Sequence, residues 1–177
     1  MKTIILSLLS FILISGNIIA QDTKYQTFKA QLKLIGQKDD QKYQWDNNKL
    51  TVALDYKTGN FISKFKNTDF ISENDPVDYE SIETKEIILR GVFPIEAIIH
   101  QKAINAKYNV ELELETEEGS YILNFNVDIT RPNTGQGSYR VFLMDGIIYN
   151  DQTNFPRLKE LDNEINLIIA FNGFSNN

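Results

Sequence analysis

The sequence predicts an all-β protein that folds as a single domain, a small antiparallel barrel of about eight strands. Apolar and polar residues alternate with period two along almost the whole chain, which is typical of half-buried strands. Turn-forming residues separate the alternating runs, and no run keeps a helical period over about ten residues. The length of 177 residues is that of one domain, and the sequence has no internal repeat.

Composition excludes several functional classes. Apolar residues make up 42% of the chain and charged residues 24%, which is ordinary for a soluble globular protein. The net charge of −6 argues against a surface that binds nucleic acid or anionic lipid head groups. Without cysteine there are no disulfides, thiolate zinc sites or cysteine nucleophiles, and the single histidine, His100, rules out a multi-histidine metal cluster. We therefore expect no catalytic residue, no metal and no cofactor.

The first twenty residues are typical of a secretory signal peptide. Lys2 precedes a short apolar run, residues 4–14, and small or polar residues lead to Ala20. The run is short and interrupted for a membrane span, although an uncleaved signal anchor is the alternative. We predict a signal peptide over 1–20, a barrel domain over 21–177, no integral membrane span after cleavage, and export to the periplasm or the extracellular space.

Each of the predicted strands has one apolar face. In chain order these faces are Phe28, Ala30, Leu32 and Leu34; Leu50, Val52 and Leu54; Phe61, Ser63 and Phe65; Tyr108, Val110, Leu112 and Leu114; Tyr121, Leu123, Phe125, Val127 and Ile129; Tyr139, Val141 and Leu143; and Ile165, Leu167, Ile169 and Phe171. The stretch 87–93 is apolar on both faces, so we expect it in the middle of the sheet or under a loop.

Turn and loop signals lie between these runs. Residues 55–59 and 117–120 are predicted hairpin turns, residues 70–81 and 131–137 longer loops, and residues 94–106 and 156–162 the places for one or two short helical turns. Asp39-Asp40 and Asp145-Gly146 are interpreted as turn residues rather than ligands.

An outer-membrane barrel alternates in the same way, with its apolar face toward lipid. Residues 87–89 and 167–171 are apolar on both faces, which a polar lumen disfavours. The strands are also short, and the chain ends in a polar tail rather than on a strand. The sequence favours the soluble barrel.

Three stretches, residues 54–61, 88–95 and 161–167, resemble the YceI-like family. The first is similar to that family's hairpin before a phenylalanine-bearing strand, the second to its strand-then-proline segment, and the third to the acidic lead-in to its final strand. The resemblance covers residues 49–172 and implies a lipocalin-like barrel that binds polyisoprenoids or other long apolar chains. Residues 25–48 depart from the family, because they lack its serine-containing opening strand and its histidine-glycine segment and carry Trp45 instead.

Polar residues give little sign of chemistry. His100 has no serine or threonine nucleophile motif beside it, so we interpret it as a structural residue. The acidic row Glu111, Glu113 and Glu115 is interpreted as a solvated strand face, because calcium sites gather oxygen ligands in a loop. A pair of carboxylates for glycoside hydrolysis is set by spatial proximity, and the sequence nominates none.

The aromatic residues on the apolar faces are the candidate binding site. Such side chains fill the core of a packed barrel, whereas in a hollow barrel they line a cavity for one elongated apolar ligand. The candidate cavity lining is Phe61, Phe65, Tyr108, Tyr121, Leu123, Phe125, Tyr139 and Phe171. We predict an exported, non-enzymatic barrel that binds a lipid-like small molecule. The alternative is a structural or protein-interaction domain with a filled core, whose loops at 70–81 and 131–137 carry the function.

Overall fold

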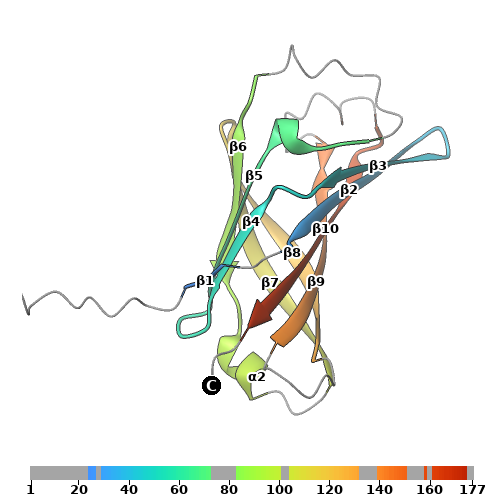
Figure 1. The fold of residues 1–177 in the computed structure, drawn as a ribbon. Helices are drawn as coiled ribbons and strands as arrows, with labels where there is room; N and C mark the ends of the chain where they lie inside the picture. The colour runs from blue at the N-terminus through green and yellow to red at the C-terminus, as the bar shows by residue number, and fades with distance from the viewer. Residues whose placement is uncertain are drawn as a thin grey trace, which may run out of the picture.

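The computed structural model describes residues 24–26, 29–72, 83–100, 104–131, 139–150, 158 and 161–174. These residues form an antiparallel sheet curled into a barrel (Figure 1). Its strands are β1 (Lys24–Gln26), β2 (Gln31–Lys38), β3 (Gln41–Asn47), β4 (Thr51–Asp55), β5 (Asn60–Lys66), β6 (Glu86–Val92), β7 (Asn105–Thr116), β8 (Gly119–Thr130), β9 (Tyr139–Tyr149) and β10 (Glu164–Phe174). Two short helical segments, η1 (Asn67–Asp69) and α2 (Ile95–Ile99), join them. The predicted all-β class is confirmed.

The barrel closes through its N-terminal strands. Gln26 lies opposite Ala53, and Leu32 lies opposite Asn47. The two segments between these pairs, 26–32 and 47–53, therefore have the same number of residues. β1–β2 and β3–β4 therefore form one long, interrupted hairpin. Its first arm pairs with β10 and its second arm with β5. In the described part of the chain, the 10 segments of the sheet thus make about eight barrel strands, as the alternation predicted.

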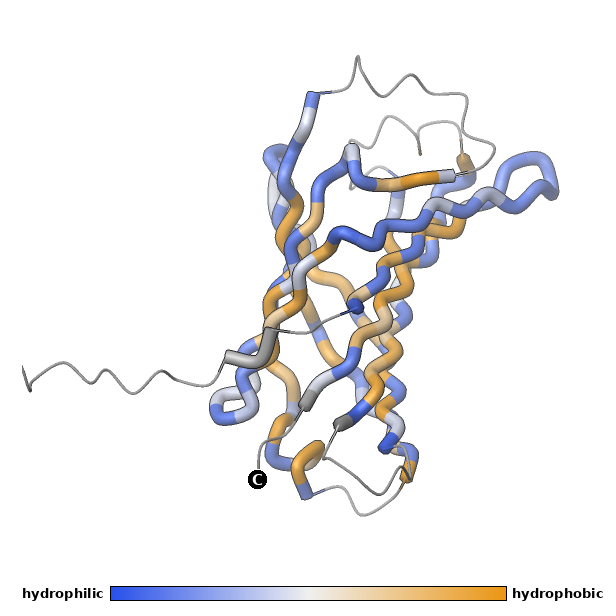
Figure 2. Tube along the Cα trace, in the orientation of Figure 1, coloured by the Kyte–Doolittle hydropathy of each residue, from blue (hydrophilic) through white to orange (hydrophobic). Residues whose placement is uncertain are grey.

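A two-residue turn joins β2 and β3. Asp39 and Asp40 have φ values of 49° and 62°, and two positive φ values are typical of the type I′ turn that fits the twist of a hairpin. Aspartate adopts this conformation more readily than most residues. The interpretation of Asp39-Asp40 as a turn is confirmed. Of the two strands that flank this turn, β2 was predicted and β3 was not. The interpretation of Asp145-Gly146 as turn residues was wrong, because both lie within β9. Figure 2 shows the hydrophilic tip of this hairpin projecting beyond the barrel wall.

Alternation places one apolar face of each strand inside the barrel. The predicted inward positions of β2, β4, β5, β8 and β10 are confirmed by buried side chains, among them Leu32, Val52, Phe61, Phe125 and Ile169. On β6, Ile87 and Leu89 face inward while Val92 is exposed, so this stretch is buried on one face only. These inward side chains join into a single hydrophobic cluster.

The prediction for β9 was wrong in register. Val141 and Leu143 were expected to face inward, yet the buried side chains of β9 are Arg140, Phe142, Met144 and Ile148, and Leu143 is 43% exposed. Both faces of this strand carry apolar residues, so period two alone did not distinguish them. A one-residue slip exchanges the two faces.

The segment after β6 covers one end of the barrel. Helix α2 lies within the predicted helical stretch 94–106 and buries Ile95 and Ile98, which we call the α2 plug. Figure 1 shows α2 at the end of the barrel where β10 finishes, opposite η1. One end of the barrel interior is therefore covered by apolar side chains of the chain itself.

Several predictions fall on residues outside the described ranges. These are the signal peptide over 1–20, most of the loops at 70–81 and 131–137, and most of the helical stretch at 156–162. They remain predictions. Within the described ranges, no helix has the length and apolar character needed to cross a membrane.

Asp55 holds the turn between β4 and β5. Its carboxylate accepts hydrogen bonds from the backbone N–H of Lys57, at 2.8 Å, and of Thr58, at 3.2 Å. The Lys57 hydrogen bond is the main cause that lowers the pKa of Asp55 below its usual value, against the opposing effect of desolvation. The sequence-predicted turn at 55–59 is confirmed by this arrangement and by the β4–β5 pairing.

We expect Asp55→Ala to lower the free energy of unfolding by about 1 kcal/mol at neutral pH, because two backbone donors lose their acceptor. A carboxylate with a lowered folded pKa stabilises above its unfolded pKa, and this contribution disappears as pH falls through the folded pKa. The difference between wild type and variant should therefore shrink below about pH 4. Urea unfolding of wild type and variant, at neutral pH and below about pH 4, measures this difference. Asp55→Asn, which keeps an acceptor oxygen, is the control; an Asp55→Ala effect independent of pH would contradict the assignment.

Candidate functional site

Four phenylalanines pack together inside the barrel near the α2 plug. The rings of Phe142 and Phe171 are stacked, with centroids 4.6 Å apart and planes at 3°. Phe61 lies 5.9 Å from Phe171 and 4.9 Å from Phe93, and Phe93 meets Phe142 edge-on at 6.2 Å. These are favourable geometries for aromatic pairs. We call these four residues the aromatic cluster.

The structure places most of the predicted lining residues inside the barrel. Phe61, Phe65, Leu123, Phe125 and Phe171 are buried and inward-facing, but Phe65 pairs with Phe70 rather than with the aromatic cluster, at 5.9 Å and 89°. The strand faces predicted for these residues are therefore confirmed, whereas their role in ligand binding remains a prediction.

The predicted tyrosines differ from these residues. Tyr108 and Tyr121 are only half-buried. The Tyr108 hydroxyl donates a hydrogen bond to the carbonyl of Ala97, so this residue fastens β7 to α2. β9 begins at Tyr139, but the side chain of Tyr139 lies outside the described part of the structure.

Sequence reasoning missed Phe70, Phe93 and Phe142. Phe93 ends the stretch that is apolar on both faces, just before Pro94, and only the chain reversal into α2 brings it under the barrel. Phe142 belongs to the face of β9 that includes a charged residue, Arg140, so that face had the weaker apolar pattern. The sequence did contain a signal for Phe142, because Met144 and Ile148 fall on the same strand face when residues alternate.

Buried polar side chains also face the interior. Asn47 and Ser63 are 0% exposed and Arg140 is 6% exposed. Within the part of the chain that the structure describes, Asn47 Nδ2, Ser63 Oγ and Arg140 Nε have no hydrogen-bond partner. Asn47 Oδ1 accepts a hydrogen bond from the N–H of Lys49, so the oxygen of this side-chain amide has a partner. Unpartnered buried polar atoms are rare in folded proteins, and each of them calls for an explanation.

The acidic row lies outside the barrel. Glu111, Glu113 and Glu115 alternate with buried residues of β7, and Glu115 pairs with Arg90 of β6. In the described ranges, no three His, Cys, Asp or Glu side chains gather into a possible metal site. His100 is exposed at the end of α2. The arrangement favours the interpretation of the row as a solvated face.

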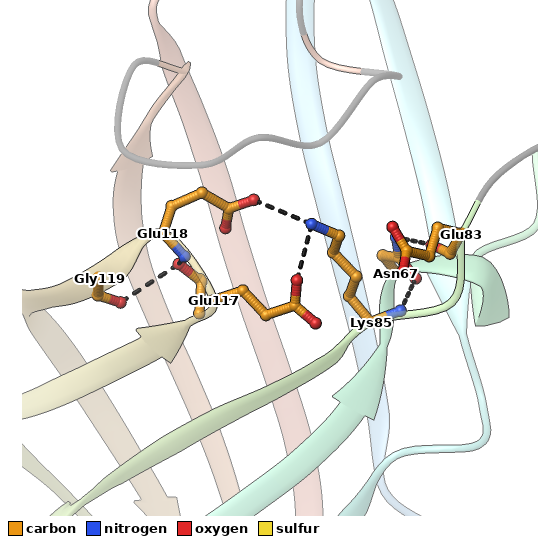
Figure 3. A network of polar contacts seen from close by, with 7 residues as sticks. Asn67, Glu83, Lys85, Glu117, Glu118 and Gly119 are labelled. Carbon is orange, nitrogen blue, oxygen red and sulfur yellow. Dashed lines mark hydrogen bonds and ion pairs between the residues drawn. The ribbon is translucent and has the colours of Figure 1, made fainter.

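A polar network ties the β7–β8 turn to the start of β6 (Figure 3). Lys85 Nζ lies 2.8 Å from Glu117 and 3.4 Å from Glu118, and hydrogen bonding to Glu117 is the main cause that raises the pKa of Lys85. The buried amide of Asn67 accepts from the N–H of Lys85 at 2.8 Å and donates to the carbonyl of Glu83 at 2.9 Å. These contacts position backbone and hold no reactive group, so we interpret them as structural.

A cleft of about 610 Å³ lies on the outer face where the β6–β7 ladder ends. Its apolar rim includes the exposed residues Val92 and Ile122, and its charged rim includes Arg90, Glu111 and Glu113. The cleft is open to solvent, and carboxylates outnumber cationic side chains in its lining. The charged side chains at its rim make it a weak candidate for a purely apolar ligand.

This chain is similar in fold to solved structures that include a polyisoprenoid-binding domain from Saccharophagus degradans, described as implicated in plant cell wall breakdown. The TM-score is 0.61 at 6% sequence identity, and the match covers 85% of this chain and 98% of that chain. No protein-family model matches the sequence. No curated protein matches it either. At this identity the likeness establishes the barrel fold.

Proposed function

We propose that this protein is an exported, non-enzymatic barrel of the YceI-like kind that binds a lipid-like molecule, such as a polyisoprenoid, in its interior. The observation that carries the proposal is the apolar and aromatic inward face to which the barrel strands contribute. The fold likeness to a polyisoprenoid-binding domain supports it. The sequence resemblance over residues 49–172 points the same way.

Apolar burial alone gives enough free energy to bind such a ligand. At about 25 cal/mol per Å², a ligand whose apolar chain buries roughly 400 Å² of its surface gains about 10 kcal/mol before the cost of association. Such binding needs no catalytic group. The candidate lining residues for this ligand are the inward residues Phe61, Phe65, Leu123, Phe125 and Phe171.

Trp45 is a built-in reporter for the proposal. It is the single tryptophan of the chain, it is 5% exposed, and it lies in the hydrophobic cluster. Farnesol, a neutral isoprenoid alcohol, should change Trp45 emission on titration, and native mass spectrometry should detect a co-purified lipid. Phe125→Leu should weaken farnesol binding by about fivefold, because it removes apolar contact area. Ile122→Ala, on the outer face of the same strand, should leave the affinity unchanged.

The alternative is a structural or interaction domain with a filled core. The close ring contacts of the aromatic cluster, 4.6 Å between Phe142 and Phe171, favour dense packing at the α2 end. For this alternative we expect no response of Trp45 to farnesol and only the mass of the bare chain. That pair of results would contradict the lipid-binding proposal.

A further inference from the structure

Arg140 is a cation inside an apolar barrel. It is the first inward-facing residue of β9 described in full, it is 6% exposed, and Phe142 follows it on the same face. Its cross-strand partner on β10 is Gly173, which has no side chain to cover it. A guanidinium therefore sits beside the aromatic cluster at the α2 end.

The hydrogen bonds of Arg140 are incomplete. Nη2 donates to the carbonyl of Ile99 at 3.3 Å, and Nε is buried without a partner among the described residues. A guanidinium has five N–H donors in a fixed planar fork, and the described residues accept one long hydrogen bond from it. The contact with Ile99 lies at the C-terminal end of α2, where a cation is favourable, but α2 is a single short turn and its dipole is small.

No acidic side chain in the described ranges forms an ion pair with Arg140. The ion pairs there join other residues, all on the outside of the barrel. Of the acids near this end, Glu96 on α2 is exposed, and Asp55 is engaged by the N–H groups of its own turn. An unpaired charge is costly to bury, so a buried arginine without a counter-ion among the described residues is suited to an anionic partner.

We propose that Arg140 anchors an anionic oxygen head group, a carboxylate or a phosphate, at the end of the ligand's apolar chain. The inference rests on the proposed function and specifies its ligand as an anionic amphiphile. Charge-assisted hydrogen bonds from Nε–H and from a guanidinium NH2 group match the oxygens of a carboxylate or a phosphate. Phe142 and Phe171, next to Arg140 inside the barrel, provide an apolar surface for the adjoining carbons.

Calorimetric titration with decanoate, decyl phosphate and decan-1-ol tests the assignment, because the three probes share one chain and differ in the head group. Wild-type protein should bind at least one anionic probe more tightly than the alcohol, and the comparison of the two anions identifies which group is preferred. Arg140→Met should weaken the anionic probes by about ten- to hundredfold and leave decan-1-ol unchanged. Arg140→Lys should fall between wild type and Arg140→Met.

Arg131→Met is the matched control. Arg131 is exposed at the same end of the barrel, so its loss changes the net charge equally while the buried guanidinium stays. If Arg140 only fastened α2, Arg140→Met would weaken all three probes alike, and the inference would be overturned. Equal affinity of wild type for all three probes would overturn it too but leave the proposed function standing. Failure to bind any probe would contradict both. Thermal unfolding of each variant shows that the fold is retained.

Discussion

Phe142→Ala is expected to lower the free energy of unfolding by about 3–5 kcal/mol, the range found for large-to-small changes of buried aromatic residues. Phe142 is 0% exposed and contacts two other rings, with Phe171 stacked at 4.6 Å and Phe93 edge-on at 6.2 Å. Its removal leaves a cavity between Phe93 and strands β9 and β10, which strand pairing holds in place so that they cannot close it. Chemical denaturation followed by Trp45 fluorescence measures the loss.

The neighbouring residue is the control for this prediction. Leu143 is 43% exposed on the outer face of the same strand, so Leu143→Ala should cost less than about 0.5 kcal/mol. The two variants together test which face of β9 is inside. A large loss for Leu143→Ala and a small one for Phe142→Ala would mean that the strand has the opposite register.

The alternation of apolar and polar residues predicted most of the fold because one face of each strand is in water. On β8, Leu123, Phe125 and Val127 are buried, and exposed residues separate them. Where both faces carry apolar residues, as on β9, the same argument has no discriminating power. Neighbouring strands decide the register there, and their contacts are not visible in local sequence.

Strand β3 of the N-terminal hairpin was missed for a related reason. β3 carries Gln41, Lys42 and Gln44, and its tip projects past the barrel into solvent on both faces (Figure 2). The half of β3 next to the turn has no buried face and therefore no apolar period, whereas Trp45 and Asn47 in its other half are buried. The turn residues, Asp39 and Asp40, were recognisable. The pairing with β2 continues the register of β1 with β4, which is a long-range feature.

The candidate site was predicted in part. Phe61, Phe125 and Phe171 follow from strand alternation, and the structure places all three inside the barrel. The composition of the aromatic cluster depends on which strands meet across the interior, so Phe93 and Phe142 joined it only in three dimensions. Arg140 was passed over because a charged residue on a strand is ordinarily exposed. Its burial is what distinguishes it from Arg131.

Gly59→Ala is expected to lower the free energy of unfolding by about 3 kcal/mol, more than an ordinary turn substitution. Gly59 has φ of +78°, and a Cβ atom there would lie 2.4 Å from the backbone oxygen of Phe93. Backbone cannot rotate away as a side chain can. The carbonyl of Gly59 also accepts the N–H of Phe93 at 2.8 Å, so the β4–β5 turn holds the residue that starts the segment leading to α2.

Gly119→Ala separates the strain of a positive φ from the clash with the Phe93 backbone oxygen. Gly119 is also a turn glycine with positive φ, of +155°, but the nearest atom to its added Cβ would be the Tyr121 hydroxyl at 3.8 Å. It should show only the conformational strain of about 1 kcal/mol. Equal losses for the two variants would contradict the role of the Phe93 contact.

If Gly59→Ala causes the larger loss of stability, displacement of Phe93 should also disturb its ring contact with Phe61, at 4.9 Å, and loosen the aromatic cluster beside Arg140. The β4–β5 turn would then be coupled to the interior through a single backbone contact.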